Sequence, residues 1–125
     1  MDAEHIRDIF SAFGPVTVRR MFGGAGIYAD GLMFALVADG AIYLKAGPQN
    51  EPDFVREGLP SFTYTGKNGK RAVMSYRRMP DRLYDDPDAL ARWAHAALAV
   101  ARDARKAPPS GRAARRATPR QAPRR

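Results

Sequence analysis

The segment Arg19-Arg20-Met21-Phe22-Gly23-Gly24-Ala25-Gly26-Ile27-Tyr28-Ala29-Asp30 holds three glycines within four positions, between two apolar runs. Glycine accepts positive φ values and a close approach of backbone, so the cluster predicts a sharp bend or a bulge. The residues from Val16 to Phe22 alternate in polarity, which is typical of a strand with one buried face. Apolar residues resume at Ile27. The segment therefore predicts two strands joined by a bend, with two arginines beside it.

Further strands follow on both sides of recognisable turn signals. The pairs Asp30-Gly31 and Asp39-Gly40 favour tight hairpins, and Asn68-Gly69 favours a third. The expected strands between and around these turns cover residues 32–38, 41–46, 62–66 and 72–77. The run 32–38 is continuously apolar, which indicates a buried strand.

Three helices are expected. The opening segment carries an apolar stripe at helical spacing, formed by Ile6, Ile9, Phe10 and Phe13, and Gly14-Pro15 ends it. A short helix follows Asn50, the expected N-cap, with Phe54 and Val55 as its anchors. Asp86 and Pro87 open the last helix. Its expected apolar face consists of Leu90, Trp93, Ala94, Ala97, Leu98 and Ala101.

The element order predicts the fold class. A helix precedes three or four strands, and a second helix, two strands and a last helix follow. Tight hairpins make the sheet mainly antiparallel, with five or six strands, and the helices must cover one of its faces. The sequence therefore predicts a two-layer α+β domain.

Composition excludes several classes of protein. The chain of 125 residues is 45% hydrophobic, which suits one domain with a packed core. No apolar run is long enough to span a membrane, and the first residues lack the pattern of a secretory signal. There are no cysteines, so disulfides and thiolate chemistry are excluded. A cytoplasmic protein with no membrane partner is the simplest expectation.

The net charge of +8 is unevenly distributed. Residues 1–101 hold twelve basic and twelve acidic residues, whereas residues 102–125 hold nine basic residues and one acidic residue. From residue 107 onward no large apolar side chain is left to bury. We therefore expect a domain over residues 1–105 and a disordered basic tail over residues 106–125.

Several segments together resemble the TfoX/Sxy N-terminal domain family. They are residues 19–28, 30–40 (DGLMFALVADG), 42–46 (IYLKA), 59–64 (LPSFTY) and 73–80 (VMSYRRMP), in that order. The resemblance covers roughly residues 4–102. Its motif residues at the bend are Arg19, Arg20, Met21, Phe22, Gly23, Gly24, Gly26 and Tyr28.

This resemblance implies a two-layer α+β fold similar to secretion-chaperone-like domains. It also implies a regulatory role, because the named members of the family activate DNA-uptake competence genes. Those members continue into a second helical domain, where this chain has a short arginine-rich segment.

No catalytic or metal-binding set is evident. His5 and His95 are far apart and lack converging carboxylates, and Asp85, Asp86 and Asp88 suit a helix N-terminus. The glycines lack the following helix that a phosphate loop needs. We therefore expect no enzyme, no cofactor and no metal.

Two groups of basic residues are candidates for contacts. The first group lies on neighbouring strands among Tyr43, Tyr64 and Tyr76, and comprises Lys45, Lys67, Lys70, Arg71, Arg77 and Arg78. It fits either single-stranded nucleic acid or an ordinary solvated face. The second group is the tail, with Arg112, Arg115 and Arg116, which fits weak phosphate binding or compositional drift. At the bend, Arg19 or Arg20 faces the side of Val18 and needs a carboxylate or backbone partner.

The hypothesis that unites these features is a non-enzymatic regulatory interaction module. It binds a protein partner, such as the transcription machinery or a regulator, while the tail attaches weakly to nucleic acid. A homodimer is a further expectation, since one layer of helices leaves part of the sheet bare. Two alternatives are a direct DNA or RNA binder that uses the basic-aromatic face, and a ligand-binding or enzymatic domain with a pocket near Gly23, Gly24 and Tyr28.

Overall fold

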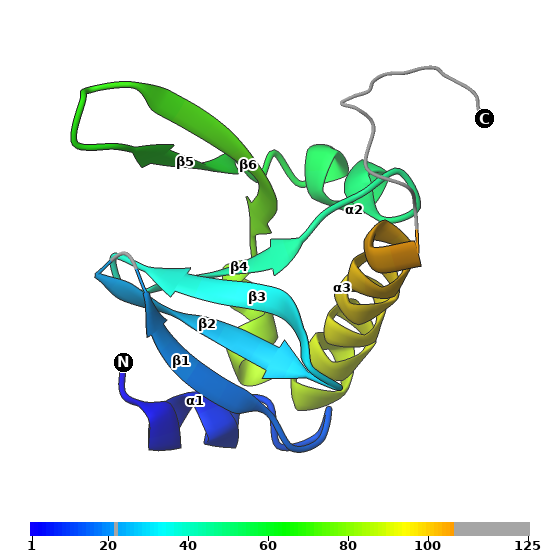
Figure 1. The fold of residues 1–125 in the computed structure, drawn as a ribbon. Helices are drawn as coiled ribbons and strands as arrows, with labels where there is room; N and C mark the ends of the chain where they lie inside the picture. The colour runs from blue at the N-terminus through cyan, green and yellow to red at the C-terminus, as the bar shows by residue number, and fades with distance from the viewer. Residues whose placement is uncertain (22, 107–125) are drawn as a thin grey trace.

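Six strands form one antiparallel sheet in the computed structural model, which describes residues 1–21 and 23–106 (Figure 1). The strands are β1 (Thr17–Met21), β2 (Gly24–Ala29), β3 (Leu32–Ala38), β4 (Ala41–Lys45), β5 (Ser61–Thr65) and β6 (Arg71–Arg78). The helices are α1 (Ala3–Ile9), α2 (Glu51–Arg56) and α3 (Pro87–Lys106), with a 3-10 helix, η1, at Asp81–Asp85. The predicted α+β class is confirmed. Phe22 and most of the predicted tail, residues 107–125, lie outside the described residues.

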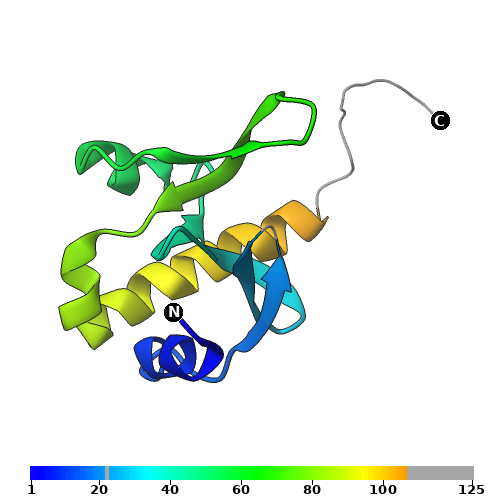
Figure 2. The same ribbon diagram turned by 90° about the vertical axis from the view of Figure 1, so that its left-hand side faces the viewer.

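The strand order in the sheet is β1-β2-β3-β4-β6-β5. Asp30 and Asp39 adopt positive φ values of 53° and 51°, each followed by a glycine, as the predicted hairpin turns require. The sequence did not indicate that β6, rather than β5, pairs with β4. The β4 pairing covers residues 76–78 of β6, and the outer part of the β5–β6 hairpin extends away from the body of the domain (Figures 1 and 2).

The core lies between the helices and one face of the sheet. Helix α3 packs against β3 and β4, and α1 lies on the same side, beside β1. Helix α2 packs on α3 through an edge-to-face contact of Phe54 with Trp93. The largest fully buried side chains are Phe10, Phe34, Phe54, Ile6, Ile27, Ile42, Leu44, Met79, Leu83 and Leu90. Burying each of these contributes about 1.5–3 kcal/mol to folding.

A bulge in the β2–β3 pairing sorts the apolar run of β3 onto two faces. Ile27 pairs with Ala35, but the next residue, Tyr28, pairs with Met33, so Phe34 is the extra residue. Phe34 enters the core and meets the ring of Phe10 edge to face, with centroids 5.6 Å apart. The bulge thereby leaves Met33 on the opposite face, opposite Tyr28.

Two sequence-based details are wrong, and a third, Asn50 as the N-cap of α2, is right in position but not in its hydrogen bonds. Helix α1 ends at Ile9, and turns continue to the bend at Gly14. Val55 is 57% exposed and anchors nothing, since a six-residue helix buries only the side of Phe54. Asn50 does not cap α2 with its side chain. Its Oδ1 instead accepts from the Gly47 N–H, and its Nδ2 donates to the Lys45 carbonyl.

Candidate interaction surface

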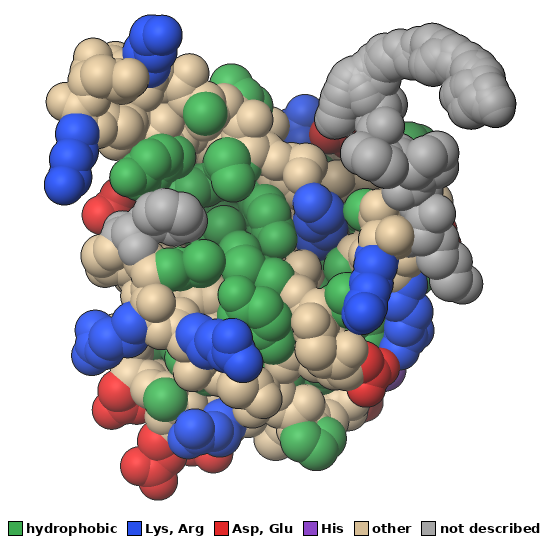
Figure 3. Space-filling model, viewed as in Figure 1, with side chains coloured by type: hydrophobic (Ala, Val, Ile, Leu, Met, Phe, Trp, Pro, Cys, Tyr) green, Lys and Arg blue, Asp and Glu red, His purple; other side chains and the backbone are tan. Residues whose placement is uncertain are grey.

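The face of the sheet opposite the helices carries a continuous apolar surface, which we call the open-face strip (Figure 3). Opposite partners in an antiparallel pair share a face, so the register identifies its members. They are Met21, Tyr28, Met33, Leu36, Tyr43 and Tyr76, and Phe62 joins them through the contact of its ring with that of Tyr43. Antiparallel sheets that face water on one side normally carry polar residues there. An apolar strip in this position is therefore unusual for a solvated face.

The three glycines of the bend have separate geometrical roles. Gly23 has a φ of +75°, which favours glycine. A Cβ on Gly24 would lie 1.8 Å from the Val37 carbonyl oxygen, so the backbones of β2 and β3 could not keep their spacing. A Cβ on Gly26 would meet the sulfurs of Met21 and Met33 at 3.0 Å each. The bare Gly26 thus allows two methionines to close over the middle of the strip.

Aromatic contacts fix the other half of the strip. The Tyr76 hydroxyl donates to the Met33 carbonyl at 3.3 Å, which ties β6 to β3 across β4. The rings of Tyr43 and Phe62 lie 5.1 Å apart at 58°, which joins β4 to β5. Burial, and next to it the proximity of Tyr28, raises the pKa of Tyr76 to about 12. Tyr76 therefore stays neutral at alkaline pH values at which an ordinary tyrosine ionises.

Two cations lie over rings of the strip. The Arg19 guanidinium is 5.2 Å from the centroid of Tyr28, and the Lys45 ammonium is 5.0 Å from that of Tyr76. Lys45 Nζ also donates to Ser75 Oγ at 2.8 Å. Burial lowers the pKa of Lys45, because partial removal from water disfavours the charged ammonium. In the described part of the chain no carboxylate forms an ion pair with either cation.

The structure divides the predicted basic-aromatic group. Lys45 borders the strip, whereas Arg77 turns to the helix side, where it bonds Glu51 at 3.0 Å and the Leu59 carbonyl at 2.6 Å. Arg78 forms an exposed ion pair with Asp81. The remaining three, Lys67, Lys70 and Arg71, are exposed on the projecting hairpin. The predicted tail contacts Arg112, Arg115 and Arg116 lie outside the described residues.

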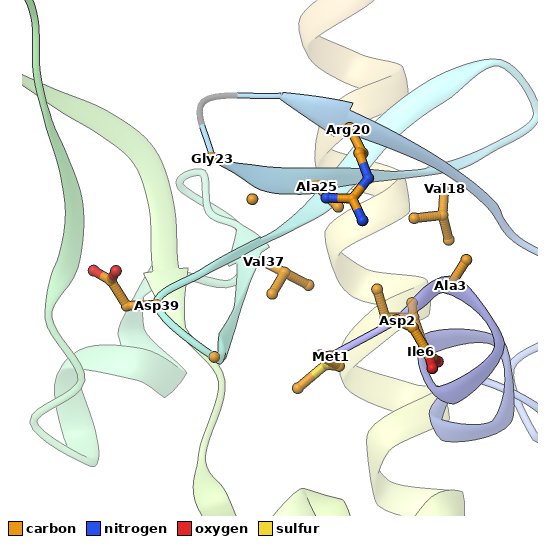
Figure 4. Close-up of a pocket in the computed structure, with 12 residues that line it drawn as sticks. Met1, Asp2, Ala3, Ile6, Val18, Arg20, Gly23, Ala25, Val37 and Asp39 are labelled. Atoms are coloured by element: carbon orange, nitrogen blue, oxygen red, sulfur yellow. The ribbon is translucent and has the colours of Figure 1, made fainter.

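Arg20 lies on the helix side of β1 and lines a cleft of about 550 Å³ (Figure 4). The cleft also contains Asp2 and Asp39, but Asp2 accepts from the His5 N–H at the start of α1 and Asp39 is directed away from Arg20. No salt bridge to Arg20 is present within residues 1–21 and 23–106, so the predicted partner for this arginine is not found there. The cleft lies near Gly23 and Gly24, yet its polar groups do not converge as a ligand pocket requires.

The described residues provide no cluster of three or more His, Cys, Asp or Glu side chains that would hold a metal ion. His5 is exposed, and His95 lies with its ring 4.6 Å from that of Phe13. None of the described helices is long and apolar enough to cross a membrane.

Sequence reasoning missed three of the seven residues of the strip. Met33, Leu36 and Phe62 drew no attention, because apolar residues in strands are assigned to the core by default. Strand alternation was the available signal. In β3 all residues are apolar, so no alternation of polarity is visible in the sequence, and the bulge places two of these residues, Met33 and Leu36, on the open face.

The comparisons with known proteins cover most of the folded region. The chain is 31% identical over 71 residues to "DNA transformation protein TfoX1" of Aliivibrio fischeri (strain ATCC 700601 / ES114), covering 54% of this chain and 34% of that protein. It is 28% identical over 78 residues to "Protein Sxy" of Escherichia coli (strain K12), covering 62% of this chain and 37% of that protein. It thus spans about a third of each of these relatives. The TfoX N-terminal domain model matches residues 8–101, and the chain belongs to that family.

Proposed function

We propose that this domain is a non-enzymatic regulatory module that binds a protein partner through the open-face strip. The observation that carries the proposal is an apolar surface on the face that the described helices leave uncovered. Contiguous apolar surface rimmed by polar groups marks interaction sites on proteins. Methionines suit such a site, because their flexible side chains adapt to a partner.

The family supports a regulatory setting for this module. One relative is named a DNA transformation protein, and about a third of its length is similar to this chain. We infer that the partner belongs to the transcription machinery or is itself a regulator, and that the protein acts in the cytoplasm. This chain spans about a third of the length of each of those relatives. A role of this chain in competence is therefore proposed here and does not follow from the similarity alone.

Site-specific photo-crosslinking in the cells that make the protein tests this proposal. A photo-crosslinking amino acid replaces Met33 in the strip or, as a matched control, Val55, which is exposed on α2. We expect a discrete light-dependent adduct from position 33 and none from position 55. An adduct at twice the mass of the chain would indicate a homodimer instead. Equal labelling from both positions, or none from position 33, would contradict the proposal.

Nucleic-acid binding is a second candidate, favoured by the three exposed basic residues of the hairpin, Lys67, Lys70 and Arg71. The tail arginines add to it, and about six phosphate contacts would give a slope near −5 of log affinity against log salt. Mobility-shift assays with the full chain separate the two regions. If the triple variant Arg112→Gln/Arg115→Gln/Arg116→Gln loses binding, the nucleic acid binds the tail. If the triple variant Lys67→Gln/Lys70→Gln/Arg71→Gln loses binding, the nucleic acid binds the hairpin. Absence of binding by the unmodified chain excludes this candidate.

A further inference from the structure

We propose that the open-face strip receives an acidic, apolar segment of the partner protein, and that Lys45 binds a carboxylate of that segment. This inference rests on the function proposed above and adds the chemistry of the partner. The supporting observations are the positive charges at the edges of the strip, on Lys45 and Arg19.

Lys45 carries a charge that the described residues do not neutralise. Its side chain is half-buried, and its ammonium makes an exposed hydrogen bond to the neutral Ser75 hydroxyl and lies over the ring of Tyr76. A desolvated charge is costly unless it is paired, and its lowered pKa reports that cost. A carboxylate placed at this end of the strip would supply the missing partner in a partly desolvated site, where such pairs are strong.

Arg19 repeats this arrangement on the other side of the strip. It is exposed, it lies over Tyr28, and no described carboxylate pairs with it. Five other described arginines, Arg56, Arg77, Arg78, Arg82 and Arg102, each form an ion pair with an acidic side chain. Figure 3 shows Lys and Arg side chains around the apolar strip, with acidic side chains mostly at the margin of the view. The rim is therefore positive.

The positive rim disfavours a second copy of this chain. Two strips packed face to face would bring Arg19 and Lys45 of both copies, which no described carboxylate pairs within one chain, into one interface. The chain's own residues 107–125 do not fit either, because they are basic and contain no large apolar side chain. An acidic segment that carries aromatic or aliphatic side chains would instead complement both the positive rim and the apolar strip.

The geometry of the rings disfavours single-stranded nucleic acid on the strip. Base stacking requires accessible ring faces. Arg19 covers a face of Tyr28, and Tyr76 is 6% exposed beneath Lys45. Tyr43 and Phe62 pack against each other. The rings of the strip thus support one another, and they leave an apolar floor for side chains rather than open platforms for bases.

Selection of peptides from a displayed library of random 12-residue sequences, with the full chain as bait, tests the inference. We expect enriched peptides that combine Asp or Glu with aromatic or aliphatic residues. Binding of a synthetic enriched peptide should weaken about tenfold or more in Lys45→Gln, recover partly in Lys45→Arg, and change less than about twofold in Lys67→Gln, the matched control on the hairpin. Binding should also raise the pKa of Lys45, seen as proton uptake at alkaline pH, which a merely structural lysine would not show. Circular dichroism verifies that each variant is folded.

The outcomes separate this inference from the proposed function. Enriched peptides without acidic residues, whose binding is lost in Met33→Asp but unchanged in Lys45→Gln, would overturn the inference and leave the function standing. If no peptide is enriched, or if Met33→Asp leaves peptide binding unchanged, both the inference and the proposed function would be overturned. Dimerisation by light scattering that Lys45→Gln strengthens, or binding of a poly-dT strand that Lys45→Gln abolishes, would show a second copy or nucleic acid as the occupant and overturn the inference.

Discussion

Replacing Asn50 by alanine should destabilise the domain substantially more than the same replacement at Asn68. Asn50 is 4% exposed and closes the turn after β4 with two hydrogen bonds. Its Oδ1 accepts from the Gly47 N–H at 2.8 Å, and its Nδ2 donates to the Lys45 carbonyl at 3.0 Å. Alanine removes both bonds and leaves a backbone donor and a backbone acceptor without partners in a partly buried turn.

The magnitude follows from that geometry. Leaving a buried polar group without a partner costs about 1–3 kcal/mol, so two such groups in a partly buried turn cost about 2–4 kcal/mol. Asn68 also accepts a backbone hydrogen bond, from the Lys70 N–H at 3.0 Å, but this bond is exposed and water can replace it. Asn68→Ala should therefore cost about 0–1 kcal/mol.

Urea denaturation followed by circular dichroism measures both variants. We expect equal slopes and a clearly lower midpoint for Asn50→Ala, because small domains unfold in one step and the change affects stability alone. If Asn50→Ala lies within about 1 kcal/mol of the unmodified chain, or if the two variants are alike, then the buried hydrogen bonds of Asn50 do not hold this turn, and the reasoning fails.

Two further predictions concern the bend and the strip. Gly24→Ala should lower the free energy of unfolding by about 3 kcal/mol or more in urea denaturation, because its Cβ would meet the Val37 carbonyl oxygen. Gly66→Ala is the control: a Cβ there has no backbone atom nearer than 3.8 Å, so the change should stay within about 1 kcal/mol. Equal losses of stability in the two variants would contradict the close approach at Gly24. Ultraviolet titration of the five tyrosines should show one late step near pH 12 that Tyr76→Phe removes. Since the folded pKa of Tyr76 is raised above 10, its contribution to stability is complete below pH 10 and is lost as the pH rises through about 12. A late step that persists in Tyr76→Phe would refute this assignment.

Much of the fold was predictable because local signals were strong. The Asp-Gly pairs required positive φ values, and these turn signals between apolar runs predicted the hairpins of β2, β3 and β4. Asp86 accepts from the Ala89 N–H, as its predicted capping role requires. The place of β6 beside β4 was not predictable, because it depends on the nonlocal pairing of Leu44 with Arg77. Nothing in the sequence near either strand specifies that partner.

The candidate surface was predictable only in part, because its members are set by register. Lys45 was singled out for its charge and does border the strip. Arg77 was singled out on the same ground, yet it bonds Glu51 on the other side of the sheet. Neighbouring positions in a strand point to opposite faces, so a basic residue is assigned to a surface only when its strand partner is known.

The bulge at Phe34 connects the core to the proposed binding surface. Without the extra residue, strict alternation would place Met33 and Ala35 on one face and Phe34 and Leu36 on the other. The bulge instead sends Phe34 and Ala35 to the helices and leaves Met33 and Leu36 for the strip. The core thereby gains the aromatic cluster with Phe10, and the open face gains apolar area that the fold itself does not require. Side chains on that face can therefore contact a partner without leaving the helix-side core, whereas changes at Phe34 would disturb both layers together.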